Sequence, residues 1–504
     1  MPSQNDIYKS NTLEHAGHYN ISDVAIITTA GQVANISSAV MEINVYEDLH
    51  SNFLSGNIVF VDTVDIVNTL PILGQEYLEF KFRTPIESNY EEGEYDFTRQ
   101  RMSIFKVTRN RLNQNSEAIT LDFVSPEAIR NQNIKISRAF NGPYDDAVAK
   151  IFKKSWGLNS KKKLYIQPTQ NNFKFITPNI RPSDIINMIA SRAVPKTSNL
   201  PGYFFYENGQ GFHFRSIDSF WFNVFAGELQ PHPEMFEYFL SSDATSGLKN
   251  PNESPLSQLR TVRSYKLRQY NDLIKNIRRG TFASTLITHD AFNKTYNTYK
   301  YNYVEDYNRV SHLEKNKEEF SGYDNAFIPY YGLVPKTHYD PDDTEFSELT
   351  KNYKNLADYE SARIMLQSNT ANLHNTNSTK GFRVDEYLQR RQSILSIVEN
   401  LELQLTVPGN THLNIGHVIR LNVPRSGPGR SGDINTQNDK YLTGRWLITA
   451  IHHKIDITSQ YHSMILTCIK ETYGATNIES NKILQLNNKE EGLPVNISNN
   501  NEYN

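Results

Sequence analysis

Residues 403–424, LQLTVPGNTHLNIGHVIRLNVP, hold two alternating runs on either side of a Pro-Gly break. In residues 403–407 Leu and Val alternate with Gln and Thr, and in residues 419–423 Ile, Leu and Val alternate with Arg and Asn. A period of two is typical of strands that bury one face. We therefore predict a hairpin of two half-buried strands, with its register fixed by the turn at Pro408-Gly409. The stretch indicates no nucleophile, general base or metal cage.

A similar pattern occurs in the first third of the chain. An aliphatic-glycine pair ending at Gly74 precedes the strand YLEFKFR, just as a pair ending at Gly416 precedes VIRLNV. The next strand follows after 30 residues in both cases, at Ile104 and at Trp446. This agreement indicates a duplicated barrel domain, and the alternative is two unrelated β-domains with the same hairpin pattern. Duplication has a geometric consequence, because three such chains around an axis present six similar modules.

The remaining segments suggest a mainly β chain with helices between its β-rich ends. Runs rich in β-branched and aromatic residues predict one all-β domain before residue 125. Pro143 at a first helical turn and Ser183 as an N-cap predict two short helices, and Asn208-Gly209 predicts a hairpin. Later segments are predicted as strands (256–310), a polar surface insertion (311–355), two helices (356–367 and 384–400), a loop (425–433) and an Asn-rich tail that we expect to be disordered or ordered by a partner (475–504).

Composition narrows the class of protein. The 504 residues suffice for two to four domains, and the single cysteine, Cys468, excludes an intrachain disulfide framework and a cysteine-based zinc cluster. A formal net charge of -3 argues against a protein that grips nucleic acid over its whole surface. The first residues lack the basic and apolar regions of a secretory signal, so we expect synthesis in the cytosol. No apolar run approaches the length of a membrane-spanning helix, so we expect no membrane segment.

Two segments formally match binding motifs. GPGRSG at 427–432 fits a dinucleotide fingerprint, but the residues after it show no helical periodicity, so an inter-strand loop is favoured. His452, His453 and His462 could be imagined as zinc ligands. Neighbours on one strand point to opposite faces, so His452 and His453 cannot both ligate one ion from a regular strand, and a structural role is favoured.

Two charged clusters have a similar double interpretation. The first, at 338–348, could bind calcium, but it lacks the central Gly and distant Glu of a calcium loop, so a solvated insertion is favoured; its acidic residues are Asp340, Asp342, Asp343 and Glu345. The second is basic, and we interpret it as a solvated or partner-facing surface rather than a nucleic-acid site; it comprises Lys153, Lys154 and Lys161 to Lys163. A glycosidase carboxylate pair stays open, because only the fold brings such groups together. We assign no catalytic, cofactor-binding or metal-binding residue.

The order of segments resembles a known family. The run VDEYLQRRQSILSIVEN, the opening stretch and then YLTGRWLITAIHHKI with YHSMILTCIKE are similar to the C-terminal part of baseplate hub proteins of contractile-tailed bacteriophages. The segment MEINVYEDLHSNFLSGNIVFVDTVDIVNTLPILGQEYLEFKFRTP resembles the start of the same proteins, and SDIINMIASRAV with GYFFYENGQGFHFRS resembles their middle. The resemblance covers most of residues 20–475. The long polar insertion and the Asn-rich tail depart from the pattern.

The resemblance implies a mainly β (α+β) fold with two tail-tube-like β-barrel domains and an interleaved α+β middle domain. The implied domains are the first barrel at 1–128, the middle domain at 129–200 and 250–380, and the second barrel at 201–249 and 381–474. It also implies a homotrimer forming a pseudo-six-fold ring between the hexameric tail tube and the trimeric central spike. The implied partners are the spike, the tube or tube-initiator protein and baseplate wedge proteins, with DNA passing through the lumen without specific binding.

We therefore expect a structural protein of the virion tail baseplate, made in the host bacterial cytoplasm, with no enzymatic activity and no cofactor. The alternative is a carbohydrate-active enzyme or receptor-binding phage tail protein that uses its aromatic residues on sugars. A deep cleft with two carboxyl groups within about ten ångströms of each other would support the enzyme.

Overall fold

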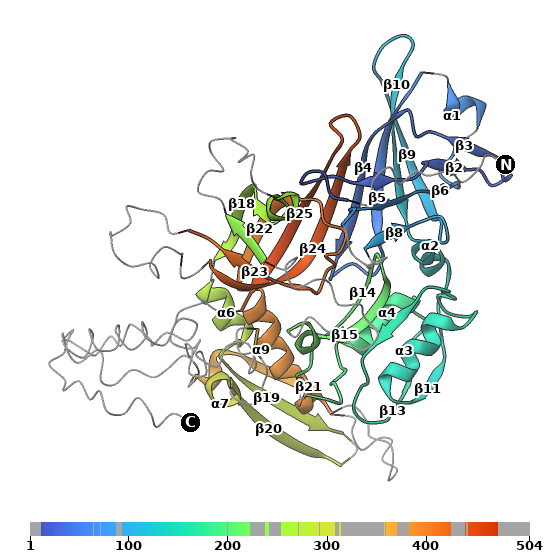
Figure 1. Ribbon diagram of the computed structural model, residues 1–504. Helices are drawn as coiled ribbons and strands as arrows, with labels where there is room; N and C mark the ends of the chain where they lie inside the picture. The colour runs from blue at the N-terminus through green and yellow to red at the C-terminus, as the bar shows by residue number, and fades with distance from the viewer. Residues whose placement is uncertain are drawn as a thin grey trace, which may run out of the picture.

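The computed structural model describes residues 12–221, 237–240, 254–313, 357–369, 383–424 and 439–471, apart from short gaps at 64, 71, 87–92, 199, 271, 292, 308–311, 358 and 440–441. Strands dominate these residues and form several sheets, so the predicted mainly β class is confirmed (Figure 1). No helix in these ranges is long and apolar enough to cross a membrane.

The N-terminal barrel is built from alternating strands whose apolar side chains point inward. Leu78, Phe80 and Phe82 are fully buried, as their period of two predicts. The strands are β1 (Asn20–Ile21), β2 (Ala25–Ile27), β3 (Val33–Asn35), β4 (Val40–Asp48), β5 (Ser55–Asp62), β6 (Tyr77–Glu79), β7 (Lys81–Arg83), β8 (Glu94–Asp96), β9 (Met102–Arg111) and β10 (Glu117–Val124), with helices α1 (Ile66–Thr69) and α2 (Pro126–Asn133) beside them.

The second barrel collects strands from distant parts of the chain. Its strands are β16 (Glu237–Leu240), β17 (Thr261–Val262), β18 (Ser264–Tyr270), β22 (Leu401–Pro408), β23 (Val418–Asn422), β24 (Gly444–Asp456) and β25 (Tyr461–Lys470), with α5 (Pro255–Leu259) leading into β17. The sheet closes on itself because β17 pairs with β16 while β18, which follows β17 directly, pairs with β22. We expected residues 250–380 in the middle domain, so the placement of β17 and β18 corrects that boundary.

Both barrels have the same strand order. In the first, neighbouring strands run β4-β5-β10-β9-β6-β2, and in the second they run β18-β22-β25-β24-β23-β16. A β-bulge interrupts the pairing of β9 with β10 and that of β24 with β25. One difference is that β16 runs parallel to β23, whereas β2 runs antiparallel to β6. The shared order is what a duplicated domain requires, and it is much harder to explain by two unrelated β-domains.

The opening stretch does not form the hairpin that we predicted. Both alternating runs are strands with buried apolar faces, but β22 pairs with β18 and β25, while β23 pairs with β16 and β24. The residues between them, 409–417, are buried along their whole length. This connection crosses the end of the barrel from one strand to a non-adjacent one. Alternation reveals which face of a strand is buried, whereas the pairing partner depends on the whole sheet.

The middle domain packs two helices against two small sheets. Its elements are β11 (Ala139–Gly142), α3 (Tyr144–Lys153), β12 (Leu164–Ile166), β13 (Phe173–Ile176), α4 (Pro182–Ala190), β14 (Tyr203–Asn208), β15 (Gly211–Ser216) and the short η1 (Ile217–Phe220). Helix α4 begins after Arg181, so Ser183 lies in the first turn and is not the N-cap. The hairpin at Asn208-Gly209 is present, but β15 pairs with β12 and its Phe212 and Phe214 join the middle core. Strands 203–216 therefore belong here rather than to the second barrel.

A third unit lies below the second barrel (Figure 1). Its elements are α6 (Leu273–Arg279), β19 (Ala283–Asp290), β20 (Thr295–Asn302), α7 (Tyr303–Tyr307), η4 (Glu360–Ala362), β21 (Ile364–Ser368), η5 (Val384–Glu386) and α9 (Leu388–Val398). The helix predicted at 384–400 is present. The helix predicted at 356–367 is wrong, because β21 pairs with β19 in a three-stranded sheet. Most of the predicted insertion, the loop at 425–433 and the tail lie outside the described residues.

Candidate functional site: the junction between the two barrels

Strand β24 belongs to both barrels. Its first residues, 444–447, pair with β23, and after a bulge at Thr449 residues 450–456 pair with β4 of the first barrel. The first barrel is completed on this side by β25, whose His462 N–H donates a 2.9 Å hydrogen bond to the Gly17 carbonyl. Ile455 accordingly lies in the core of the first barrel, although the rest of its strand begins in the second. The two barrels are thus one continuous sheet.

The buried connection 409–417 fills the space between the barrels. The Thr84 N–H donates to the Thr411 hydroxyl at 2.9 Å, and the Thr411 N–H donates to the Thr84 hydroxyl at 3.1 Å. A Cβ placed on Gly409 would meet the His462 ring at 1.9 Å, so only glycine allows this close approach. The connection 409–417, which we predicted as the turn of a hairpin, is therefore a packed contact between the two barrels.

A row of buried polar groups runs through the same junction. His462 Nε2 lies 3.1 Å from His453 Nδ1, and His453 Nε2 lies 3.1 Å from the Tyr95 hydroxyl. The Tyr95 hydroxyl donates to the Glu47 carboxylate at 2.9 Å, and the Gly209 N–H donates to the same oxygen at 2.7 Å. The row connects β25, β24, β8 and β4 with the hairpin of the middle domain. It therefore ties both barrels and the middle domain together at one place.

Burial controls the charge of these groups. It raises the pKa of Glu47 to about 7 and lowers the pKa of His462 to about 3. It also holds the pKa of His453 well below its ordinary value, with the neighbouring His462 adding to the effect. Both histidines are neutral at pH 7, and Glu47 is poised between its two forms. A row in this state carries little net charge, which suits a buried interface.

Polar pairs also connect β4 and β24 on the face of the sheet opposite the row. His452 Nε2 lies 2.7 Å from Asn44 Oδ1, and Lys454 forms a 3.0 Å ion pair with Glu42. His452 thus lies on the face opposite His453, as strand geometry predicts. Of the three histidines that we considered for zinc, His453 and His462 are in contact and His452 is not. The described residues contain no group of three or more His, Cys, Asp or Glu side chains placed to hold a metal ion.

An ion-pair network attaches the middle domain to the first barrel. Lys162 Nζ lies 2.5 Å from Glu207 and 2.9 Å from Glu127, and all three side chains are nine-tenths or more buried. Glu207 also accepts hydrogen bonds from the Ser125 hydroxyl and the Leu54 N–H at 2.6 and 2.9 Å. Lys162 therefore does not belong to a solvated surface, which corrects part of our interpretation of the basic cluster.

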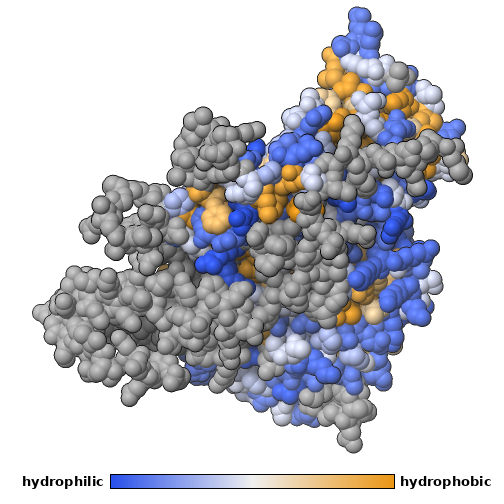
Figure 2. Space-filling view, in the orientation of Figure 1, coloured by the Kyte–Doolittle hydropathy of each residue, from blue (hydrophilic) through white to orange (hydrophobic). Residues whose placement is uncertain are grey.

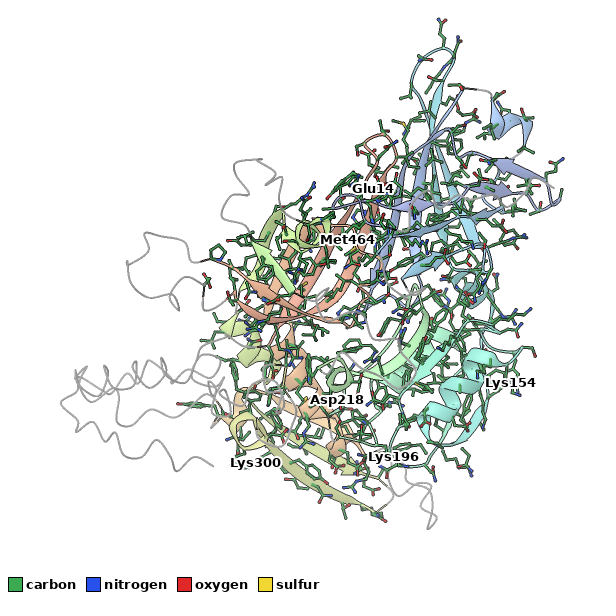
Figure 3. The ribbon with its side chains drawn as sticks, in the orientation of Figure 1. Glu14, Lys154, Lys196, Asp218, Lys300 and Met464 are labelled. Atoms are coloured by element: carbon green, nitrogen blue, oxygen red, sulfur yellow. The ribbon has the colours of Figure 1, made fainter. Side chains whose placement is uncertain are left out.

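The other members of that cluster do match the interpretation, since Lys153, Lys154, Lys161 and Lys163 are exposed. Figure 3 shows Lys154 at the outer edge of the molecule, beyond α3, and Met464 within the second barrel. Cys468 is fully buried, and burial raises the pKa of its thiol. Two of the weighed motifs, GPGRSG at 427–432 and the acidic residues of 338–348, lie outside the described residues.

A cavity beside β20, α7 and α9 is lined by several carboxylates. Its volume is about 410 Å³, and Lys300, labelled in Figure 3, lies on its wall. Its acidic residues are Glu305, Asp306, Asp385 and Glu386. Arg390 binds Asp306 through both oxygens at 2.6 and 2.7 Å, and Arg383 pairs with Asp385 and Glu386 at 2.8 and 3.2 Å. Asp306, Asp385 and Glu386 are thus each paired with an arginine, which gives three of the four carboxylates of this cavity a partner within the protein.

Sequence reasoning singled out His453 and His462 of the junction but missed its other residues. Glu47 follows Ile43 and Val45 at a period of two, so a carboxylate continues the buried face of a strand. That pattern was a usable signal, because a charged residue on a buried face needs a partner. Tyr95 and Glu207 gave no comparable signal, since their partners come from strands far away in the chain.

No family model matches the chain. It is 22% identical over 442 residues to a probable baseplate hub protein of Vibrio phage KVP40, an alignment that covers 84% of this chain and 89% of that protein. Among solved structures it is similar to a tail protein from Neisseria meningitidis (TM-score 0.45, 11% identity, 90% and 97% of the two chains covered). It is also similar to a 43 kDa tail protein of prophage MuSo2 from Shewanella oneidensis (TM-score 0.45, 10% identity, 89% and 98% covered). The resemblance to phage baseplate hub proteins, which we predicted from the order of segments, is confirmed by the similarity to the Vibrio phage protein across most of both chains.

Proposed function

We propose that this protein is a structural hub of a contractile phage baseplate. Three copies form a ring of six similar barrels, which joins the hexameric tail tube to the trimeric central spike. The proposal deepens the coarser role of a baseplate hub or tail protein, which the similarity to a phage hub protein supports. The protein works by matching symmetries and catalyses no reaction.

The observation that carries the proposal is the repeated strand order of the two barrels. A chain with two equivalent modules presents a six-fold surface when three copies surround an axis, and a three-fold surface where the modules differ. The middle domain contributes the difference, because the Glu47 row and the Lys162 network attach it beside the first barrel. One face of such a ring can therefore meet a hexamer and the other a trimer.

The proposed partners follow from this geometry. They are two further copies of the chain, the central spike, the tail tube or its initiator protein, and the wedge proteins of the baseplate. DNA passes through the lumen without specific binding, and a formal net charge of -3 suits a passage that does not hold phosphate. The protein is made in the host bacterial cytoplasm and ends in the virion tail.

The test is the stoichiometry and shape of the purified chain. Native mass spectrometry gives the number of copies, and negative-stain electron microscopy gives the number of lobes. We expect three copies and a ring of six similar lobes around a central opening. A stable assembly with any other number of copies contradicts the proposal. Addition of a candidate spike protein serves as the second arm, because a spike partner binds the three-fold face and leaves the count at three.

A further inference from the structure

The internal junction offers a template for the contact between copies. Strand β24 supplies its edge to β4, and the equivalents of these two strands in the repeated order are β9 and β18. Within the described residues, β9 pairs with β6 only at its start, and no strand pairs with its edge beyond residue 105. In the same part of the chain, β18 pairs with β22 on one side only. Each barrel therefore presents one half of the pairing that the internal junction completes.

The bulges give the register of the two repeats. Phe105 is the bulged residue of β9, and Thr449 is the bulged residue of β24. The residues before them make matching hydrogen bonds. The Ile104 N–H donates to the Glu76 carbonyl and the Ile448 N–H donates to the His417 carbonyl, both at 2.9 Å. Cross-strand pairs then relate the outer strands. In the first barrel, the residues that face one another on successive strands are Lys106, Asp122, Asn57 and Asn44. In the second barrel, the corresponding residues are Ala450, Thr467, Gln404 and Lys266. Asn110 is thus the equivalent of Lys454, and Lys266 that of Asn44.

Burial shows which edge lacks a neighbour. Ile43 and Val45 on β4 are fully buried, because β24 lies beside them. Their equivalents on β18 are Tyr265 and Leu267, which pair with the buried Leu405 and Leu403 yet remain 39% and 37% exposed. Strand edges that expose apolar side chains invite another strand. The first barrel has hydrophobic surface as well, in orange at the upper right of Figure 2, and Phe105 on β9 is 50% exposed.

We propose that β9 of one copy adds to β18 of the next copy as an antiparallel strand, with Asn110 opposite Lys266. The inference rests on the proposed ring and names the contact that closes it. The occupant is a second copy of this chain, because only β9 repeats the position that β24 takes against β4. A contact between two different edges is heterologous, and it closes into a ring when the rotation between copies allows.

Charge does not oppose this pairing, although both strands carry basic residues. Lys106 pairs with Asp122 at 3.4 Å and Arg109 with Glu117 at 2.7 Å, both within the sheet of the first barrel. Arg268 pairs with Glu402 at 3.2 Å in the second barrel. Lys106, Arg109 and Arg268 therefore bring their own carboxylates to the interface. Of the other cations on the two strands, Lys266 faces Asn110 and Arg111 faces Tyr265 in the proposed register. Like charges are thus not placed directly opposite each other.

The test is a disulfide between copies. The double variant Asn110→Cys, Lys266→Cys places thiols opposite each other across the proposed ladder, at a separation that a disulfide spans. Both positions are exposed, whereas the native Cys468 is buried and does not compete. The matched control is Asn110→Cys with Lys174→Cys, because Lys174 is an exposed residue of the middle domain. Each variant is oxidised as purified full-length chain and separated on a denaturing gel.

We expect the double variant to give covalent dimers and trimers, with reduction returning single chains, and the control to stay single. Native mass spectrometry of the same samples separates two failures. Three copies without a cross-link overturn the strand pairing and leave the proposed ring intact. An assembly of another size, or single chains at every concentration, overturns both.

Discussion

His453 Nδ1 on β24 lies 3.1 Å from His462 Nε2 on β25, and both rings are fully buried at the junction of the barrels. The neighbouring bonds fix which atom donates. The Tyr95 hydroxyl donates to Glu47, so His453 Nε2 donates to Tyr95, and His462 Nε2 must then donate to His453 Nδ1. Each group therefore donates a hydrogen bond to the next in one direction, from β25 towards β4.

Replacing Glu47 by alanine removes the acceptor at the end of the row. The Tyr95 hydroxyl and the Gly209 N–H would remain buried without their partner, so we expect a loss of roughly 3 kcal/mol in the free energy of unfolding. Denaturant unfolding measures it. The matched control, Glu47→Gln, keeps an acceptor oxygen and should lose less than half as much. Equal losses would mean that the charge, and not the hydrogen bonds, matters at this position.

Stability should fall as the pH drops below about 6.5, the usual pKa of histidine. Burial lowers the pKa of His412 to about 4 and the pKa of His417 and His462 to about 3. Between these values and 6.5 the unfolded chain binds a proton at each histidine and the folded chain does not. Each histidine therefore costs up to about 1.4 kcal/mol per pH unit on acidification. Thermal unfolding from pH 7 to pH 4.5 measures the trend.

Glu47 opposes that trend. Its folded pKa of about 7 lies above its ordinary value, so its contribution is present at low pH and is lost as the pH rises through 7. Replacing Glu47 by glutamine removes this opposing effect, because the folded chain then binds up to one proton fewer. The free energy of unfolding should therefore depend more steeply on pH between about 4.5 and 7. The comparison needs only the two chains at a series of pH values. Parallel curves would contradict the raised pKa of Glu47.

Gly409→Ala tests the packing of the connection 409–417 between the barrels. The added Cβ would meet the His462 ring at 1.9 Å in a fully packed place, and we expect a loss of about 2 kcal/mol or more. Gly202→Ala is the control, because the nearest atom there, on Ile217, lies at 3.2 Å and can yield by a few tenths of an ångström. Thermal unfolding should show a clear drop for the first variant and a small change for the second.

Lys162→Ala tests the attachment of the middle domain. The carboxylates of Glu127 and Glu207 would stay buried without their cation, which costs about 3 to 5 kcal/mol when one partner of a buried pair is removed. Lys154→Ala, at an exposed position, should leave stability within about 0.5 kcal/mol of the original chain. If both lysines proved equivalent in denaturant unfolding, the network would not hold the domains together.

Strands and their buried faces could be predicted, because a period of two is a local property of the chain. The runs at 77–83 and 403–407 illustrate this, as does the duplication read from Gly74 and Gly416. The predicted spacing was close but not correct in register, because the structural equivalent of Ile104 is Ile448 and not Trp446. The bulges at Phe105 and Thr449 are equivalent in the two repeats, so the difference arises in the connections that precede these strands. A spacing counted along the sequence does not reveal the length of such a connection.

Pairing partners and domain boundaries could not be predicted in the same way. The strands β14 and β15 and the strands β17 and β18 each joined a different sheet from the one expected. Apart from the β14–β15 hairpin itself, their hydrogen-bonding partners lie tens to more than a hundred residues away, and no nearby residue specifies them. The candidate site could be predicted only in part for the same reason. His453 and His462 were given a structural role, but their row with Tyr95 and Glu47 assembles from β4, β8, β24 and β25 only when the barrels have formed.

The sharing of β24 also has a mechanical consequence. Seven residue pairs, from Ala450 with Asp48 to Asp456 with Glu42, join the barrels along the length of two strands. A force that drags one barrel past the other along these strands must shear this ladder as a whole, and cannot peel it one pair at a time. The junction therefore resists sliding of one barrel past the other along these strands.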